Sequence, residues 1–500
     1  MLRTFRITLA TIFFIGLTLL FLDFTGTAHT WLGWMAKTQF LPAVLALNAV
    51  VIIALIVFAL IFGRIYCSVV CPLGVIQDIF GWLGKKSRKN RYTYSKGLPW
   101  LRYAMLALMV IAIIAGAATI VQLLAPYSAF GRIATMLLQP LWQLGNNIVA
   151  GFAERADSYA FYSVDVWVKS IPVLIIAAVT LIVLALLAWR GGRTYCNTIC
   201  PVGTVLSFFA RFSLLKIRFN ADKCRNCSLC TKNCKASCID FKNHRVDYSR
   251  CVVCGDCLKS CKFDALHYSF VSPFAPSAKP TNGKQQAQQT PPDAGRRSFM
   301  LATAMATTAA IAQETKRVDG GLADIVGKKA PSRQTPLTPP GSLSASNMAK
   351  RCTGCQLCVS ECPNGVLRPS TELMNLMQPV MSYERGYCRP ECTRCGDVCP
   401  TGAIQPIDRA EKSVIQIGHA VVSTAHCISA NGTDECGNCE RHCPVGAIEM
   451  VPTDPDDILS PSVPAVKEAL CIGCGACEYV CPVRPLSAIH VEGHNVHRHV

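Results

Sequence analysis

The chain has 500 residues, of which 51% are hydrophobic, 8% are aromatic and 29 are cysteines. This length predicts three or four domains, and the positive mean hydropathy indicates a protein that is partly embedded in a membrane. The formal net charge of +18 treats every cysteine as neutral. Since metal-bound cysteines are thiolates, basic residues are needed to balance them, and we predict no nucleic-acid partner.

Four long apolar runs lie in the first 190 residues. They span Phe5–Leu22, Leu41–Phe62, Tyr103–Ala125 and Ile171–Trp189. Each run is long enough, or nearly so, to cross about 30 Å of hydrocarbon as a helix. We therefore predict an all-α membrane domain of four transmembrane helices over residues 1–215, with an interfacial helix within residues 129–150.

Basic residues indicate how this domain is oriented. Arg3 and Arg6 precede the first run, seven basic residues lie between Lys85 and Arg102, and five follow the fourth run between residues 190 and 218. Because loops rich in lysine and arginine remain in the cytoplasm, both ends of the four-helix unit are predicted to be cytoplasmic.

The second and fourth runs end in the same motif, G-R-x-Y-C-x3-C-P-x-G. It occupies residues 63–74 and 192–203 and contributes Cys67, Cys71, Cys196 and Cys200. Its repetition indicates a duplication with pseudo-twofold symmetry. Within each motif the i, i+4 spacing places both thiols on one helical face. We predict that the four thiols meet near the cytoplasmic surface, where they either ligate a further metal centre or act as redox-active thiols.

Most of the other cysteines form six groups of four. Four groups have the spacing C-x2-C-x2-C-x3-C of bacterial ferredoxins. These are Cys224, Cys227, Cys230 and Cys234; Cys251, Cys254, Cys257 and Cys261; Cys352, Cys355, Cys358 and Cys362; and Cys471, Cys474, Cys477 and Cys481. Two variants have a longer first gap: Cys388, Cys392, Cys395 and Cys399; and Cys427, Cys436, Cys439 and Cys443. Cys238 belongs to no group and is predicted to be an ordinary thiol.

This spacing predicts six [4Fe-4S] clusters held by those 24 cysteines. Zinc sites use two separated cysteine pairs, and disulfide scaffolds do not repeat one spacing six times. We expect α+β ferredoxin-like modules at residues 216–272 and 346–500. In the first module the groups should exchange their fourth cysteines, Cys234 and Cys261. In the second, the four groups could pair in sequence or be nested, first with fourth and second with third.

Residues 273–345 are rich in Pro, Gln, Ala, Thr and Ser and are predicted to be a linker. Within it lies Arg296-Arg297-Ser298-Phe299-Met300-Leu301, followed by a weakly apolar stretch that includes Ala310-Ile311-Ala312. The twin-arginine stretch and the apolar residues after it are typical of a twin-arginine export signal. Ala310-Ile311-Ala312 is typical of a cleavage site. Export through it would place the second module in the periplasm and leave the first in the cytoplasm.

The order of these features resembles two known families. Residues 1–270 resemble NapH, with four membrane helices, two C-x3-C-P motifs and a two-cluster module; residues from about 296 resemble NapG/MauM, with a twin-arginine leader and four clusters. The chain therefore resembles a NapH–NapG fusion in the bacterial inner membrane. The resemblance implies quinol oxidation and electron transfer to a separate periplasmic reductase, such as nitrate reductase, or to its cytochrome subunit. Similarity of the C-x3-C-P part to CcoG implies an alternative, a redox factor for metalloenzyme assembly.

Overall fold

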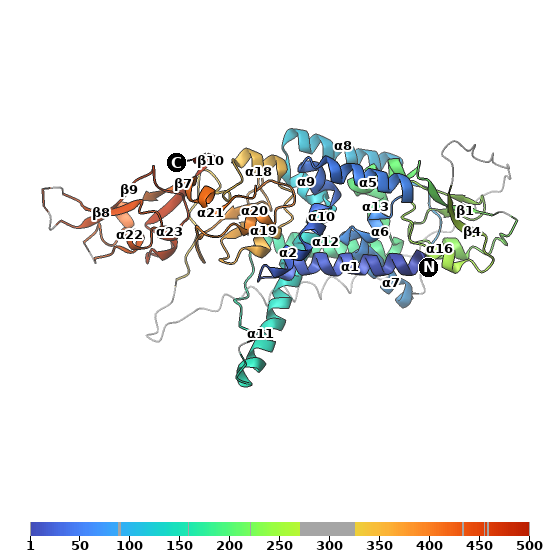
Figure 1. Ribbon diagram of the computed structural model, residues 1–500, viewed down its shortest axis with the longest axis horizontal. Helices are drawn as coiled ribbons and strands as arrows, with labels where there is room; N and C mark the ends of the chain where they lie inside the picture. The colour runs from blue at the N-terminus through green and yellow to red at the C-terminus, as the bar shows by residue number, and fades with distance from the viewer. Residues whose placement is uncertain are drawn as a thin grey trace, which may run out of the picture.

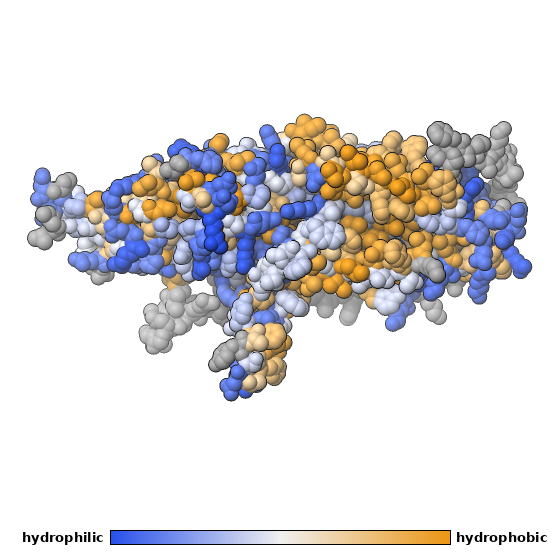
Figure 2. All heavy atoms as spheres, viewed as in Figure 1, coloured by the Kyte–Doolittle hydropathy of each residue, from blue (hydrophilic) through white to orange (hydrophobic). Residues whose placement is uncertain are grey.

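The computed structural model describes residues 2–88, 92–158, 160–220, 222–270, 326–432, 435–454, 456–457 and 460–499. The twin-arginine segment and Ala310-Ile311-Ala312 lie outside these ranges. A helical unit occupies the middle of the elongated molecule, with one cysteine-rich module at each end (Figure 1). Hydrophobic side chains cover the helical unit, whereas the surface of both ends is largely hydrophilic (Figure 2). This distribution suits a unit that lies in lipid between two parts that lie in water.

Two of the four predicted spans are continuous helices. These are α1 (Leu2–Leu22) and α12 (Ile171–Gly191), each of 21 residues. At 1.5 Å per residue, such a helix is about 30 Å long, which matches the hydrocarbon thickness of a bilayer. Side chains such as Ile12 and Ile175 are about half exposed on their outer faces, as expected for contact with lipid.

The other two predicted spans are broken into shorter helices. The second consists of α4 (Phe40–Leu45) and α5 (Ala49–Phe62), separated by a turn in which the Asn48 side chain accepts a hydrogen bond from the Val51 amide. The third consists of α8 (Pro99–Ala115) and α9 (Ala118–Leu124), because Gly116 takes a left-handed conformation with φ 71° and ends α8. Four unbroken spans are therefore not observed. The described residues contain two helices that could cross a membrane by length and composition, or three if α9 and Pro126–Arg155, bent by 79°, count as one.

The predicted interfacial helix is only partly a surface element. Its region forms α10 (Pro126–Ile133), the π-helical η1 (Ala134–Leu138) and α11 (Gln139–Arg155). Every residue of α10 is buried, and Phe130 packs against Phe14 and Phe21 of α1. Only α11, which projects from the unit in Figure 1, has a largely exposed surface. The apolar stretch at 129–138 thus belongs to the core of the unit, where it contacts α1 and α12.

Short helices surround the two C-x3-C-P motifs and the loop after α1. They are α2 (Thr27–Leu32), α3 (Trp34–Lys37), α6 (Tyr66–Val69), α7 (Pro72–Arg88), α13 (Thr194–Thr198) and α14 (Pro201–Ala210). The prolines at the first positions of α7 and α14 suit a helix start, where no amide donor is needed. Each motif therefore has the same local structure, a one-turn helix that contains its first cysteine and a longer helix that begins after its second.

The first module is a small α+β unit. Its outer strands, β1 (Leu215–Phe219) and β4 (Leu266–Phe270), pair antiparallel from Leu215 opposite Phe270 to Phe219 opposite Leu266. Between them lie α15 (Leu229–Lys232), β2 (Ile239–Asp240), β3 (Arg245–Val246) and α16 (Asp256–Ser260). The two short helices contact each other, which brings the two cysteine groups together.

The second module contains two similar units in succession. The first comprises α18 (Ala345–Arg351), α19 (Leu357–Glu361), β5 (Leu367–Pro369), β6 (Pro379–Met381) and α20 (Arg394–Asp397). The second comprises α21 (Arg409–Val414), β7 (Ile415–Val422), η2 (Thr424–His426), α22 (Asn438–Arg441), β8 (Ile448–Pro452), β9 (Ser462–Val466), α23 (Ala476–Val480) and β10 (Ile489–His499). β7 pairs antiparallel with β10, and the register shifts between Gly493 and Arg498. Part of the last unit, including Ile448 and Ile489, forms a small buried core of its own, whereas Ile417 and Val491 belong to the large core of the chain.

Residues 326–345, predicted as linker, pack against the second module instead. The Arg333 guanidinium forms an ion pair with both carboxylate oxygens of Glu478, at 2.7 and 2.8 Å, and donates to the Val491 carbonyl. Glu478 is buried, so its charge requires this partner. Leu337 is also buried. The composition of this stretch suggested a linker, but these long-range contacts place its last part in the folded module.

The C-terminal strand β10 carries a buried histidine whose charge state should affect stability. Burial, together with His494 and His499, lowers the pKa of His497 from 6.5 to about 4, and its Nε2 lies 2.9 Å from Thr338 Oγ1. The folded state therefore favours neutral His497, so the stabilisation is full above pH 6.5 and is lost as the pH falls toward 4. We expect about 2 kcal/mol less stability for this module at pH 5 than at pH 7, measured by denaturant unfolding of the full chain. His497→Gln should remove that part of the pH dependence. His442→Gln, at an exposed position of the same module, should retain it, and an unchanged pH profile in His497→Gln would contradict the assignment.

Both modules are attached to the helical unit through specific contacts. At one end Arg3 of α1 forms a 2.8 Å ion pair with Asp256 of the first module. At the other, Lys169 Nζ donates to the Val359 carbonyl at 2.9 Å, and Thr119 Oγ1 to the Leu373 carbonyl at 2.9 Å. These contacts attach the two modules to opposite ends of the helical unit.

Candidate iron–sulfur sites

The two groups of the first module are interleaved as the spacing predicts. Cys224, Cys227 and Cys230 line one cavity of about 350 Å³ together with Cys261 of the other group. Cys257 interacts electrostatically with Cys254, Cys251 and Cys234, which completes the second quartet. Cys238, predicted to be an ordinary thiol, lies beside this quartet, with its sulfur 3.5 Å from that of Cys234.

The second module resolves the choice between pairing in sequence and nesting. Each fourth cysteine lies with the first three cysteines of its sequence neighbour. Cys362 lines a cavity of about 390 Å³ with Cys388, Cys392 and Cys395. In return, Cys399 lies within electrostatic range of Cys352, Cys355 and Cys358.

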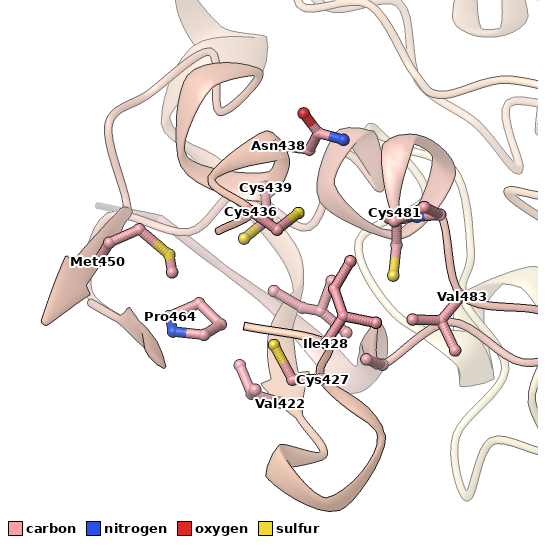
Figure 3. Close-up of a pocket in the computed structure, with 13 residues that line it drawn as sticks. Val422, Cys427, Ile428, Cys436, Asn438, Cys439, Met450, Pro464, Cys481 and Val483 are labelled. Carbon is pink, nitrogen blue, oxygen red and sulfur yellow. The ribbon is translucent and has the colours of Figure 1, made fainter. Parts of the chain in front are cut away.

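The last two groups are interleaved in the same way. Cys427, Cys436, Cys439 and Cys481 line a cavity of about 390 Å³, and Figure 3 shows these four sulfurs arranged around an apolar space. Cys443 lines a second cavity, of about 280 Å³, with Cys471, Cys474 and Cys477. The nested arrangement is therefore not what the structure shows. The short helices α22 and α23 contact each other, which holds sequence neighbours side by side.

The cavities suit four-iron clusters better than single metal ions. Within the described parts of the chain, no three His, Cys, Asp or Glu side chains converge as ligands of one metal ion. A four-iron cluster instead needs four sulfurs spread around a common space, which is what these cavities provide. Burial raises the pKa of the Cys254 and Cys474 thiols to about 12, so a bound metal is needed to make them thiolates at neutral pH.

The four C-x3-C-P thiols come together inside the helical unit. Cys67, Cys71, Cys196 and Cys200 are all buried, and each lies within electrostatic range of the others. They come from α6 and α13 and from the residues that precede α7 and α14. The structure thus brings the four motif thiols together, whereas their position near the cytoplasmic surface stays a prediction.

Other motif residues explain why the repeat is conserved within the chain. Arg64 of the first motif donates to the Cys196 carbonyl of the second at 3.0 Å, and Arg193 of the second donates to the Cys67 carbonyl of the first. Gly74 and Gly203 lie beside these same arginines, and a Cβ atom on either would stand less than 3 Å from a guanidinium nitrogen. Two reciprocal arginine contacts therefore join the motifs. In the sequence, these arginines and glycines could be found only as the repeated G-R and P-x-G positions of the motif.

A buried charge network and one amide surround these thiols. Asp78 of α7 lies 2.6 Å from Arg193, 2.7 Å from Lys235 and 3.0 Å from Arg6. Burial alone would raise the pKa of Asp78, but these three cations outweigh it and hold the pKa well below its usual range. Gln77 Nε2 lies 3.2 Å from the Cys196 sulfur. The sequence motif did not identify Asp78 or Gln77 as neighbours of the thiols, since both lie after it.

The cysteine quartets follow one another along the molecule. The quartet that contains Cys234 lies next to the C-x3-C-P thiols, because Arg193 N donates to the Lys235 carbonyl at 2.8 Å. On the other side, Tyr195 interacts with Cys200, and Tyr127 with Cys355. Gly131 of α10 contacts the Cys355 backbone so closely that a Cβ atom would stand 2.1 Å from its carbonyl oxygen.

The line of quartets continues through the second module. Cys388 donates its amide to the Cys474 carbonyl at 3.0 Å, so the second quartet of this module adjoins the one at Cys471, Cys474 and Cys477. The quartet that contains Cys436 therefore lies at the far end.

Comparison with family models supports the iron–sulfur assignment. A "4Fe-4S binding domain" matches residues 44–91 and 170–220. A "4Fe-4S dicluster domain" matches 351–403 and 434–484, and another matches 247–366. The two segments matched by the first model, 44–91 and 170–220, contain four cysteines, and all four belong to the C-x3-C-P motifs. The fold and these sites define a ferredoxin-type iron–sulfur electron-transfer protein with candidate membrane helices.

Relatives specify the family further. The ferredoxin-type protein MauM of Paracoccus denitrificans is 30% identical over 195 residues, which are 37% of this chain and 85% of that protein. The chain belongs to the family of MauM ferredoxin-type proteins. NapH of Escherichia coli is 28% identical over 39% of this chain and 55% of its own length. MauN of Paracoccus denitrificans is 26% identical over 35% of this chain, and the match covers half the length of MauN.

Proposed function

We propose that this chain oxidises a membrane quinol and passes the electrons to a separate periplasmic reductase or its cytochrome subunit. The observation that supports it is the succession of cysteine quartets from one module, past the C-x3-C-P thiols, to the other. Each quinol oxidised to quinone releases two electrons and two protons; the protons pass to water, and the electrons leave through the chain. Each [4Fe-4S] cluster, when bound, accepts and passes on one electron at a time.

The ligands proposed for six clusters are the 24 cysteines of the ferredoxin-type groups. For Cys67, Cys71, Cys196 and Cys200 we propose a seventh cluster instead of a redox-active thiol pair. Their common burial supports this, and so does the family model that covers only these four cysteines. The backbone contacts of Arg64 and Arg193 would hold the two motifs at a fixed separation around it.

The seventh cluster can be tested by removing one of its ligands. Cys196→Ala should lower the iron content by about four atoms per chain and remove one cluster signal from the electron paramagnetic resonance spectrum. The control is Ser68→Ala. Ser68 is buried in α6 next to the proposed ligand Cys67, and this substitution should retain all iron. If Cys196→Ala changes only the number of free thiols and leaves the iron content unchanged, the four cysteines are redox thiols.

We further propose that residues 1–215 cross the membrane four times, with two crossings broken as described above. The first module, residues 216–272, is then cytoplasmic. The second, residues 346–500 with its preceding docked segment, is periplasmic, and the linker within 273–345 exports it as a NapH–NapG fusion would require. The attachment of the modules to opposite ends of the helical unit supports this topology. Protease added to intact spheroplasts should digest an epitope tag at the C-terminus and leave a tag on the first module intact.

Quinol oxidation is tested with the purified full chain in lipid nanodiscs. Duroquinol or menadiol should reduce the clusters, as followed by loss of their visible absorbance, and dithionite defines complete reduction. If both quinols leave every cluster oxidised while dithionite reduces them, quinol oxidation fails. Reduction of a bound metal ion or protein thiol by the same preparation would then favour the assembly-factor alternative.

A further inference from the structure

A large open cavity lies where the helical unit meets the first module. Its volume is about 720 Å³, and α1, α7 and the first module line it. Ile7, Phe14, Ile79 and Trp82 form an apolar wall, and Arg6, Gln77, Asp78 and Lys235 form a polar one. An amphipathic molecule with a compact polar head and an apolar tail would match both walls.

Two buried polar atoms in this cavity lack partners. Gln77 is only 1% exposed, and its Oε1 accepts no hydrogen bond; Arg6 is 5% exposed, and its Nε donates none. A buried polar group without a partner costs about 1–3 kcal/mol, which indicates that a ligand satisfies it. Both residues line the cavity, and the two atoms lie just below its surface, so a small rotation of each side chain would bring them to a bound molecule.

The Gln77 amide also connects the cavity with the C-x3-C-P thiols. Its Nε2 lies 3.2 Å from the Cys196 sulfur, while its other end has the unpartnered oxygen. A molecule bound to Gln77 Oε1 would therefore be separated from a sulfur of the proposed seventh cluster by a single side-chain amide. Asp78 carries three cationic partners and stays ionised, so its role is to hold Arg6 and Lys235 in place.

We propose that this cavity is the binding site for the quinol and quinone headgroup. A quinol hydroxyl donates to Gln77 Oε1, a quinone carbonyl accepts from Arg6 Nε, and the tail lies along the apolar wall toward the lipid. This assignment rests on the proposed quinol oxidation and gives it a location. The open side of the cavity, next to Lys85 and Lys259, provides water that accepts the two protons.

A photoreactive azidoquinone, mapped by mass spectrometry on the full chain in nanodiscs, tests the location. Labels should be recovered between residues 3 and 14 or between 75 and 85. Thr11→Trp fills the cavity and should lower labelling about tenfold or more. Ile12→Trp is the matched control, since Ile12 is the next residue of α1 and does not line the cavity. Gln77→Leu should lower labelling about fivefold while dithionite still reduces every cluster.

The outcomes separate this site from the proposed function. Labelling elsewhere, or equal labelling of Thr11→Trp and the unmodified chain, overturns the site even if quinol still reduces the clusters. Labelling in the cavity without cluster reduction by quinol retains a quinone site but rejects quinol oxidation. Loss of the label in nanodiscs rich in cardiolipin, but not in phosphatidylcholine, would show that an anionic lipid headgroup occupies the cavity and would overturn the assignment.

Discussion

Cys355→Ala should stop electrons from quinol at the helical unit. The quartet of Cys355 is the part of the second module that contacts α10, through Gly131, and it precedes the other three quartets in the observed order. Its loss should remove about four iron atoms per chain. In rapid-mixing experiments with duroquinol, the clusters of the first module should still be reduced, whereas the three remaining clusters of the second module should stay oxidised.

Two comparisons make this prediction specific. Dithionite should reduce the three remaining clusters of Cys355→Ala, which shows that they are intact. Cys436→Ala removes the quartet at the far end, so quinol should still reduce all the others. If quinol reduces the whole second module of Cys355→Ala at the normal rate, electrons enter it by another route and the proposed order is wrong.

Asp78→Asn should strongly destabilise the helical unit. Among the described contacts, Asp78 is the only carboxylate within 3.0 Å of Arg6, Arg193 and Lys235, and the substitution removes its charge. Arg193 is fully buried. Breaking a buried ion pair by removing one partner costs about 3–5 kcal/mol. Thermal unfolding of the detergent-purified protein should show this loss. Asp222→Asn, on the exposed surface of the first module, should change stability by less than about 0.5 kcal/mol.

The pH dependence of this effect follows from the lowered pKa of Asp78. Its stabilisation is present above the unfolded-state pKa of about 4 and is lost only as the pH falls below that value. Asp78→Asn should therefore cost the same at pH 6 and pH 8. A penalty that disappears between those values would mean that Asp78 is protonated in the folded protein and that its three cations find other partners.

The fold could be predicted in kind but not in detail. Apolar length identified α1 and α12, but it could not show the turn at Asn48 or the left-handed Gly116, since both interrupt runs that remain apolar in composition. The stretch at 129–138 appeared suited to a membrane surface, yet helices from distant parts of the chain bury it. Composition likewise assigned Arg333 to a linker, because its partner Glu478 is 145 residues away.

The sequence by itself determined the chemistry of this protein. Cysteine spacing is a local property, since three ligands of a cluster lie on one loop, so the quartets and the repeated C-x3-C-P motif are visible without a structure. Only the tertiary structure decided which group of the second module receives each fourth cysteine. It also decided the order of the quartets, the reciprocal contacts of Arg64 and Arg193, and the cavity at Gln77. These depend on which helices and strands pack together, and that is set by contacts between residues far apart in the chain.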